Sequence, residues 1–203
     1  MIVIFYKIIL DFDGVIGASI SSMCKSLETI RNLPEGTYNP KLVKKWNFED
    51  VIPELDHDRV NDMFESDIFW RNLKPINGAI EFINKYRDDI VICTIGTNKN
   101  IQKKLAWIEK HLGKVDVLPI IINIGSHHTA IDKSVIDMTN CILVDDNVNA
   151  LDTSNAKYKI LFDEFGEWNA EWQLTNKNYY KKYSSYDEIE YFINFISENV
   201  NGY

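Results

Sequence analysis

The sequence predicts an α/β fold with a parallel β-sheet, helices on both faces and a small helical segment inserted after the first strand. Short apolar runs recur along the chain, and segments of helical period lie between them. Strands that alternate with helices in this way form a parallel sheet. The 203 residues, with 45% hydrophobic and 26% charged side chains, have the composition of one compact globular unit.

Five apolar runs are expected to form strands that are buried on both faces of the sheet. Each is bounded by polar residues and is too short for a buried helix. These runs are Ile2–Leu10, Ile90–Ile95, Val117–Ile124, Cys141–Val144 and Tyr158–Phe162.

Helices of the predicted core are marked by apolar spacing and by end signals. One helix follows residue 76, and a second spans residues 101–112, with Gly113 placed to end it. A last helix is expected to begin at Ser185, where Glu188 completes a Ser-x-x-Glu capping box. Its apolar stripe consists of Ile189, Phe192, Ile193 and Ile196.

Residues 17–74 interrupt the alternation of strands and helices. Ser19–Leu33 and Asp56–Trp70 have helical patterns, and the connection between them contains Pro34, Gly36, Pro40 and Pro53. This segment is expected to be a helical cap over an α/β active site. Residues 1–16 and 75–203 would then form the core.

Charge and cysteine content limit the partners and the compartment that we expect. The chain carries 22 basic and 30 acidic residues, a net charge of −8, so long nucleic acid is not an expected partner. A small anionic substrate fits if a bound cation reverses the local field. The three cysteines form no CxxC pair and the sequence shows no signal peptide or membrane span, which favours a cytoplasmic protein. A homodimer is one assembly that the sequence leaves open.

The most informative motif is a pair of carboxylates at the end of the first strand. Asp11 and Asp13 follow the apolar residues 8–10, and Gly14 comes next. Ligands bind at the carboxyl ends of strands in open parallel sheets. Two nearby carboxylates can divide their roles, one as a nucleophile or metal ligand and the other as a general acid/base. An isolated pair of this kind is equally typical of a solvated turn.

Three further elements complete a phosphoryl-transfer pattern. Asp145 and Asp146 follow another apolar run, and two such strand ends supply the oxygen ligands that Mg²⁺ prefers. Thr94 ends the second strand, where its hydroxyl could donate to a phosphate oxygen. Lys133 would neutralise the phosphate and the carboxylates. Other lysines that could take this role are Lys99, Lys103 and Lys104.

These elements, in this order, resemble the four motifs of the haloacid dehalogenase (HAD) superfamily, which has a Rossmann-like core. The resemblance implies that Asp11 is the nucleophile of an aspartyl-phosphate and that Asp13 is the acid/base. It also implies that Mg²⁺ is held by the Asp11 carboxylate, the Asp13 carbonyl and Asp145, with Asp146 in the outer shell through water. Thr94 and Lys133 would hold the phosphoryl group.

Within that superfamily, the chain is most similar to the 5′(3′)-deoxyribonucleotidases of the cytosolic type C group. The similarity lies in residues 69–79, 92–94, 105–113 and 145–146. The group commonly has Thr-Ser-Pro where this chain has Thr94-Ile95-Gly96, and Ile95 cannot donate a side-chain hydrogen bond. Cap aromatics stack on the base in this group, and here Phe69, Trp70 and Trp46 are candidates for that role or for plain core packing.

The resemblance implies a Mg²⁺-dependent phosphomonoesterase for (deoxy)nucleoside monophosphates. An acid/base two residues after the nucleophile favours hydrolysis, because it can protonate the leaving group and then activate water. Two other hypotheses stay open. One is a phosphatase for another small phosphometabolite or a polynucleotide 3′-phosphate end, and the other is a binding module that keeps the fold without turnover.

Overall fold

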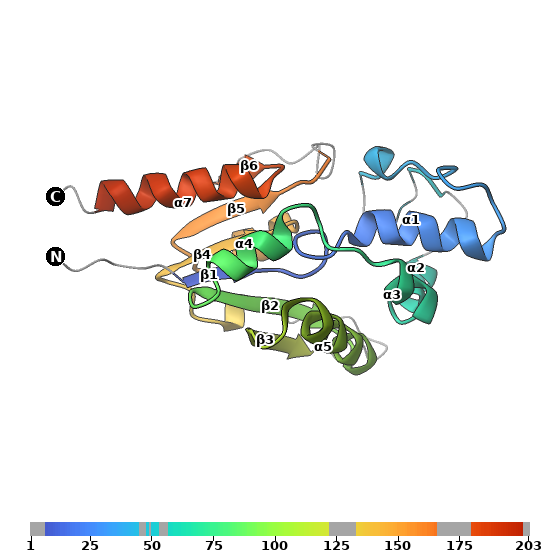
Figure 1. Cartoon of the computed structure of the whole chain (residues 1–203), viewed down its shortest axis with the longest axis horizontal. Coiled ribbons are helices and arrows are strands. Elements are labelled where there is room, and N and C mark those ends of the chain that lie inside the picture. The colour runs from blue at the N-terminus through green and yellow to red at the C-terminus, as the bar shows by residue number, and fades with distance from the viewer. Residues whose placement is uncertain are drawn as a thin grey trace.

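The described residues form a six-stranded, wholly parallel sheet with the strand order β3-β2-β1-β4-β5-β6 (Figure 1). The computed structural model describes residues 7–44, 48, 50–52, 57–121, 133–165 and 180–200. The sheet confirms the predicted α/β class. The strands are β1 (Lys7–Leu10), β2 (Ile90–Gly96), β3 (Asp116–Ile121), β4 (Cys141–Asp145), β5 (Tyr158–Phe162) and β6 (Tyr180–Tyr183).

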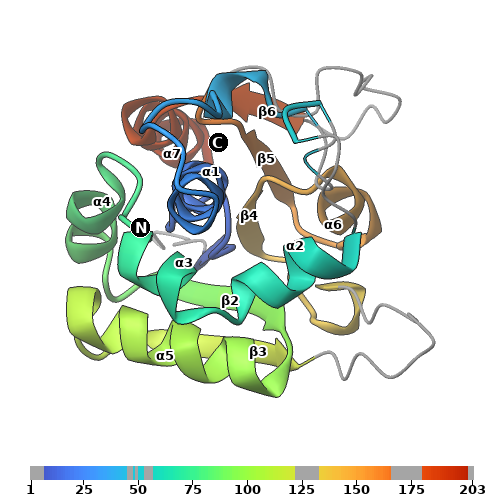
Figure 2. The same cartoon turned by 90° about the vertical axis from the view of Figure 1, so that its right-hand side faces the viewer.

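Helices cover both faces of the sheet (Figure 2). The side-chain alternation of the strands accounts for two cores. Ile8 and Leu10 face a large core shared with α4 (Ala79–Lys85), α5 (Asn98–Leu112) and α7 (Tyr186–Val200). Ile9 points the other way, into a smaller core shared with α6 (Val148–Thr153). A short 3₁₀ turn, η2 (Lys133–Val135), lies against α6.

The structure contains the predicted end of α5 and the predicted start of α7. Gly113 closes α5 with φ 67°, and its N–H donates to the Glu109 carbonyl. The backbone N–H of Ser185 donates to the Glu188 carboxylate, and the Ser185 hydroxyl accepts from the Glu188 N–H. The capping box at the start of α7 is therefore formed.

β6 is a strand that the apolar-run analysis did not predict. Its sequence, Tyr-Lys-Lys-Tyr, has no apolar run, and it pairs in parallel with β5 at the border of the sheet. Lysines are common on edge strands because they discourage further pairing. Lys182 lies 2.8 Å from the carboxylate of Asp163, which ties the strand to the end of β5.

The inserted segment lies beyond the carboxyl ends of the strands, on the right of Figure 1. The single helix expected over Asp56–Trp70 is two helices, because Ser66 begins a new one by accepting a hydrogen bond from the Phe69 N–H. The elements of the segment are α1 (Ser19–Ile30), η1 (Pro40–Leu42), α2 (His57–Phe64) and α3 (Asp67–Asn72).

The two ends of this segment lie side by side. The Ala18 N–H donates to the Lys74 carbonyl at 2.9 Å, and the Ile76 N–H donates to the Ile16 carbonyl at 2.8 Å. The chain therefore leaves and re-enters the core at one place, and the boundaries expected at residues 17 and 74 remain a prediction. Among the described helices, none is both long enough and apolar enough to span a membrane.

Candidate active site

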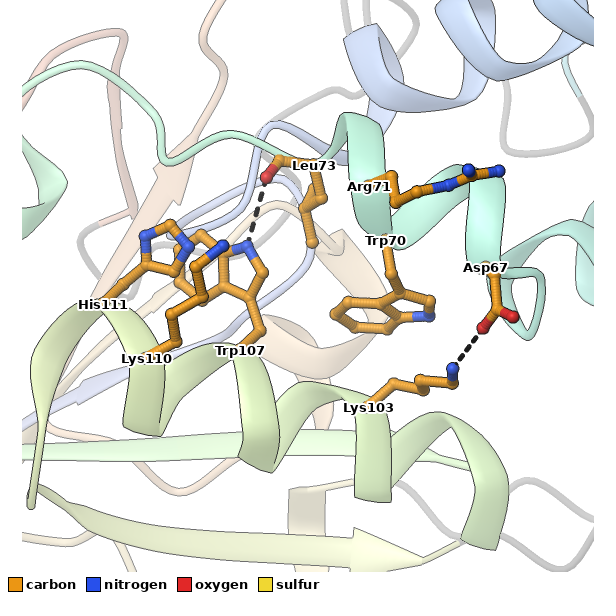
Figure 3. A pocket seen from close by; sticks show the side chains of 8 residues that line it. All are labelled: Asp67, Trp70, Arg71, Leu73, Lys103, Trp107, Lys110 and His111. Carbon is orange, nitrogen blue, oxygen red and sulfur yellow. Dashed lines mark hydrogen bonds and ion pairs between the residues drawn. The ribbon is translucent and has the colours of Figure 1, made fainter.

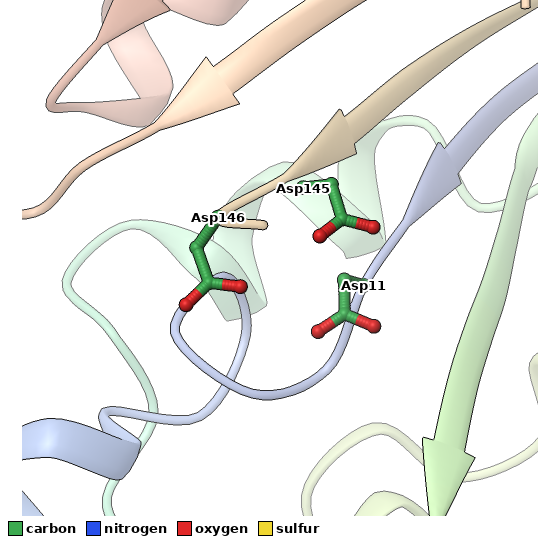
Figure 4. A group of neighbouring side chains, drawn as sticks. All are labelled: Asp11, Asp145 and Asp146. Carbon is green, nitrogen blue, oxygen red and sulfur yellow. The ribbon is translucent and has the colours of Figure 1, made fainter. Parts of the chain in front are cut away.

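The register of the sheet brings the two predicted acidic motifs together. Leu10 is paired with Val144, and the Asp11 N–H donates to the Val144 carbonyl at 2.9 Å. Asp11 and Asp145 therefore leave adjacent strands at the same level, with Asp146 directly after. Carboxylate oxygens of these three buried residues lie within 4.8 Å of one another (Figure 4).

Lys133 joins the two strand-end carboxylates. Its Nζ lies 2.5 Å from Asp11 Oδ1 and 2.5 Å from Asp145 Oδ2, and the residue is only 1% exposed. Burial disfavours the charged ammonium, but the attraction of Asp11 and Asp145 outweighs this and raises the pKa of Lys133. The other Asp145 oxygen accepts a hydrogen bond from the Asn147 N–H at 2.9 Å.

Negative charge exceeds positive charge in this cluster, since three carboxylates share the nearby ammonium group of Lys133. Burial raises the pKa of Asp145 to about 6, against the lowering effect of Lys133. Burial and then the neighbouring carboxylates raise the pKa of Asp146 well above its usual value. A divalent cation would relieve this repulsion, and buried carboxylate oxygens are the ligands that suit Mg²⁺. The donor set therefore fits the expected metal.

A second buried lysine holds Asp13. Lys104 Nζ lies 2.5 Å from Asp13 Oδ2, and the Ser19 hydroxyl donates to Asp13 Oδ1 at 2.8 Å. The same ammonium group donates to the Thr94 hydroxyl at 2.7 Å and to the Ile95 carbonyl at 2.8 Å. Lys104 thus connects the end of β2 with the loop after β1. Thr94 is buried, and its hydroxyl proton remains available for donation because the hydroxyl oxygen accepts from Lys104.

The sequence offered Lys104 only as a substitute for Lys133, whereas both lysines lie among the predicted motif residues. A signal for Lys104 was present in the helical spacing. It lies on the same buried stripe of α5 as Ile101, Ile108 and Leu112. A lysine on an apolar stripe needs a partner, because a buried ammonium group is unfavourable when unpaired.

Gly14 lets the chain turn back between the two acidic motifs. Its φ of 69° lies in the left-handed region, and its N–H donates to the Gly17 carbonyl at 3.0 Å. A Cβ atom at this position would lie 2.3 Å from Asp146 Oδ2. The glycine is thus required both by its conformation and by the close approach of Asp146.

The aromatic residues of the inserted segment that were candidates for stacking on a base differ in burial. Phe69 is fully buried between Phe64 and Trp70, with ring centroids 4.8 and 5.4 Å away. Its ring has no exposed face, so its position indicates core packing and does not support the expected stacking on a base. Trp70 is partly exposed and lines a groove beside Trp107. Trp46 lies outside the described residues.

Comparison with known proteins identifies the family. Residues 4–184 match the family described as "5′ nucleotidase, deoxy (Pyrimidine), cytosolic type C protein". The chain belongs to this family. A relative of this chain is the human "5′(3′)-deoxyribonucleotidase, cytosolic type", which is 26% identical over 128 residues. The match covers 57% of this chain and 62% of the human protein, so it spans about three fifths of that relative.

Solved structures show that this chain has the HAD-like fold. A HAD family hydrolase from Deinococcus radiodurans, solved with bound phosphate and sodium, superposes with a TM-score of 0.57 at 13% identity. That match covers 93% of this chain and 94% of the other. A haloacid dehalogenase-like hydrolase from Streptococcus pneumoniae gives a TM-score of 0.56 at 10% identity, with 92% and 98% covered.

Proposed function

We propose that the protein is a Mg²⁺-dependent phosphomonoesterase that hydrolyses (deoxy)nucleoside monophosphates through an aspartyl-phosphate on Asp11. The observation that carries this proposal is the shared position of Lys133 between Asp11 and Asp145, with the third carboxylate of Asp146 beside them. Membership of this nucleotidase family and the activity in the name of the human relative support the choice of substrate.

In this proposal, an Asp11 carboxylate oxygen attacks the phosphorus atom and the ester P–O bond breaks. Asp13 gives a proton to the departing oxygen, then takes one from water, and that water attacks phosphorus and releases Asp11 and inorganic phosphate. Ser19 and Lys104 orient the Asp13 side chain, which is partly exposed.

The remaining groups balance the charge of the reaction. The Asp11 and Asp145 carboxylates and the Asp13 carbonyl would hold Mg²⁺, and the nearby Asp146 carboxylate would contact it through water. When bound, the cation stabilises the negative charge of the phosphoryl group and of the carboxylates. Lys133 stabilises the same charge from the side of Asp11, and the Thr94 hydroxyl donates to the transferring group.

Phosphate release is the direct test. A panel of 5′- and 3′-(deoxy)nucleotides and sugar phosphates would be assayed with Mg²⁺ and with EDTA, for the wild type, Asp11→Asn and the exposed-site control Asp88→Asn. We expect metal-dependent release from nucleotides, a loss of at least about 10³-fold in Asp11→Asn, and full activity in the control.

The outcomes separate mechanism from substrate. Unchanged activity in Asp11→Asn would contradict the covalent mechanism. A preference for sugar phosphates would keep the mechanism and overturn the nucleotide assignment, and absence of turnover on all substrates would favour the binding-module alternative.

A further inference from the structure

A groove separates the inserted segment from the core on the side of α5. It has a volume of about 580 Å³ and lies between α3 and α5 (Figure 3). Drug-sized ligands occupy pockets of this volume. Among the described residues that line it, none is one of the acidic, threonine or lysine residues assigned above to phosphate or metal.

The groove is positively charged although the protein carries a net charge of −8. Its lining contains the cations of Arg71, Lys103 and Lys110 and the carboxylate of Asp67. Asp67 forms an ion pair with Lys103, as drawn in Figure 3. The excess of cations favours a ligand with more than one negative charge, because an anion gains most where the local field opposes that of the whole molecule.

Flat ring systems form the rest of the wall. Trp70 is partly exposed and its indole lies beside Lys103 in the groove. His111 stacks on Trp107, with ring centroids 4.1 Å apart and planes 17° apart. Indole rings next to cations recognise ligands that combine an aromatic ring with an anionic group, since the ring stacks and the anion pairs with the cations.

Two rings that line the groove also pack against Phe12, which lies between the proposed catalytic residues Asp11 and Asp13. The Phe12 ring lies 6.0 Å from the ring of Trp70 and 5.2 Å from that of Trp107. Phe12 is fully buried, and it lies in the chain between Asp11 and Asp13. The Lys104 ammonium group, which holds Asp13, lies 5.5 Å from the centre of the same ring.

Contacts across the groove join the inserted segment to the core. The indole N–H of Trp107 donates to the Leu73 carbonyl at 3.1 Å, in addition to the ion pair between Lys103 and Asp67. A ligand that touches both walls would therefore stabilise the present position of α3 on α5, and of the rings that pack against Phe12.

We propose that this groove is a second ligand site, which binds a nucleoside di- or triphosphate and thereby changes turnover at the catalytic carboxylates. The base stacks beside Trp70, and the phosphates pair with Arg71 and Lys110. The lining of this site contains none of the proposed catalytic, phosphate-binding or metal-binding residues, and the proposal assigns Trp70, a stacking candidate for the active site, to this groove. The site binds its ligand whether or not the chain hydrolyses nucleotides.

Binding would be measured first by titration calorimetry without metal, on the full chain carrying Asp11→Asn, with thymidine triphosphate and adenosine triphosphate as probes. Arg71→Ala combined with Lys110→Ala removes two exposed charges of the groove. Lys41→Ala combined with Lys114→Ala removes two exposed charges elsewhere and serves as the matched control. We expect at least tenfold weaker binding in the groove variant and less than a twofold change in the control.

Three results would overturn this proposal. The first is that the groove variant binds the nucleotide as tightly as the control does. The second is displacement of the nucleotide by inorganic phosphate, which would place the nucleotide in the active site. The third is that inorganic triphosphate binds as tightly as the nucleotide, which would exclude a role for the aromatic rings. Failure of phosphate release in the wild type would instead overturn the proposed function, because calorimetry on Asp11→Asn requires no turnover.

A kinetic readout follows on the background with intact Asp11. We expect the probe nucleotide to change turnover of a monophosphate substrate at least twofold in the wild type and in the control variant. The groove variant is expected to keep the basal rate and to lose this response. A response that persists in the groove variant would contradict the coupling through Trp70, Trp107 and Phe12.

Discussion

The ammonium group of Lys104 lies 2.5 Å from the carboxylate of Asp13, and Lys104 is only 1% exposed. The same group donates to the hydroxyl of Thr94. Lys104 thus fixes the residue proposed as the acid/base relative to the residue proposed to contact phosphate. Breaking one half of a buried ion pair is costly, because the remaining charge loses its partner.

Replacing Lys104 with methionine should reduce kcat strongly and also lower the free energy of unfolding, because Asp13 loses its buried partner. Methionine fills a similar volume, but Asp13 keeps only the hydrogen bond from Ser19. We expect kcat to fall about 10²-fold, with a shifted pH profile of kcat, as measured by steady-state phosphate release across pH. Lys99→Met, at an exposed position on the same helix, is the control. Equal activity in the two variants would show that Lys104 has no role in positioning Asp13.

Replacing Gly14 with alanine should damage the acidic cluster. The left-handed φ of 69° disfavours alanine, and the new methyl group would meet Asp146 Oδ2 at 2.3 Å. We expect a loss of about 1–3 kcal/mol in the free energy of unfolding, and weaker Mg²⁺ binding. Urea unfolding and calorimetry would measure the two effects. Gly36→Ala, where φ is also positive but no atom lies within 4 Å, separates backbone strain from the clash with Asp146.

Binding of Mg²⁺ should depend on pH with a defined sign. The pKa of Asp145 is raised to about 6, so its carboxyl is protonated below that pH and a metal must displace the proton. We expect binding to be about fivefold weaker at pH 5 than at pH 6 and to release protons, which calorimetry in buffers of different ionisation enthalpy detects.

The raised pKa of Asp145 should make the metal-free protein less stable as the pH rises, whereas Mg²⁺ binding becomes stronger. A carboxyl whose folded pKa lies above its unfolded value makes the folded state bind more protons, so stability falls as pH rises from about 4 to 6. Added Mg²⁺ should remove this decrease. A Mg²⁺ affinity that is flat between pH 5 and 6 would contradict a metal role for Asp145.

Replacing Tyr186 with phenylalanine should destabilise the protein without changing the site chemistry. The Tyr186 hydroxyl is buried and donates to the Val15 carbonyl at 2.8 Å, and burial raises the pKa of this phenol. The variant leaves that carbonyl without its partner, at a cost of about 1–2 kcal/mol in the free energy of unfolding. Urea unfolding would compare it with Tyr191→Phe, at a position that is 74% exposed. Equal stability of the two variants would contradict this role.

The core strands could be predicted because a strand buried on both faces is an uninterrupted apolar run, as in Cys141–Asp145. The edge strand Tyr180–Tyr183 has no such run, since it borders the sheet and carries two lysines. The break between α2 and α3 was missed for a related reason. Ser66 interrupts a helical pattern that is otherwise continuous, and a single capping serine changes the spacing of apolar residues very little.

The acidic residues of the candidate site could be predicted because they directly follow apolar strands, and strand register then determines their distances. Lysine positions are harder to predict, because a long side chain reaches its partner from a separate helix or turn. Lys133 reaches Asp11 across 122 positions of sequence, and Lys104 reaches Asp13 from α5. The spacing of the acidic residues in the sequence does not indicate which lysine will contact each of them. The groove beside Trp70 depends on how α3 meets α5, which no local pattern specifies.

The adjacent backbone hydrogen bonds at Ala18 and Ile76 have a consequence for how this family can diversify. Because the inserted segment begins and ends at neighbouring points, residues can be gained or lost within it while the strands that carry Asp11 and Asp145 keep their register. If residues of this segment select the substrate, specificity can change while the catalytic carboxylates stay in place. A chimera that exchanges residues 17–74 with the same segment of a relative should keep a working core and acquire the donor's choice of substrate.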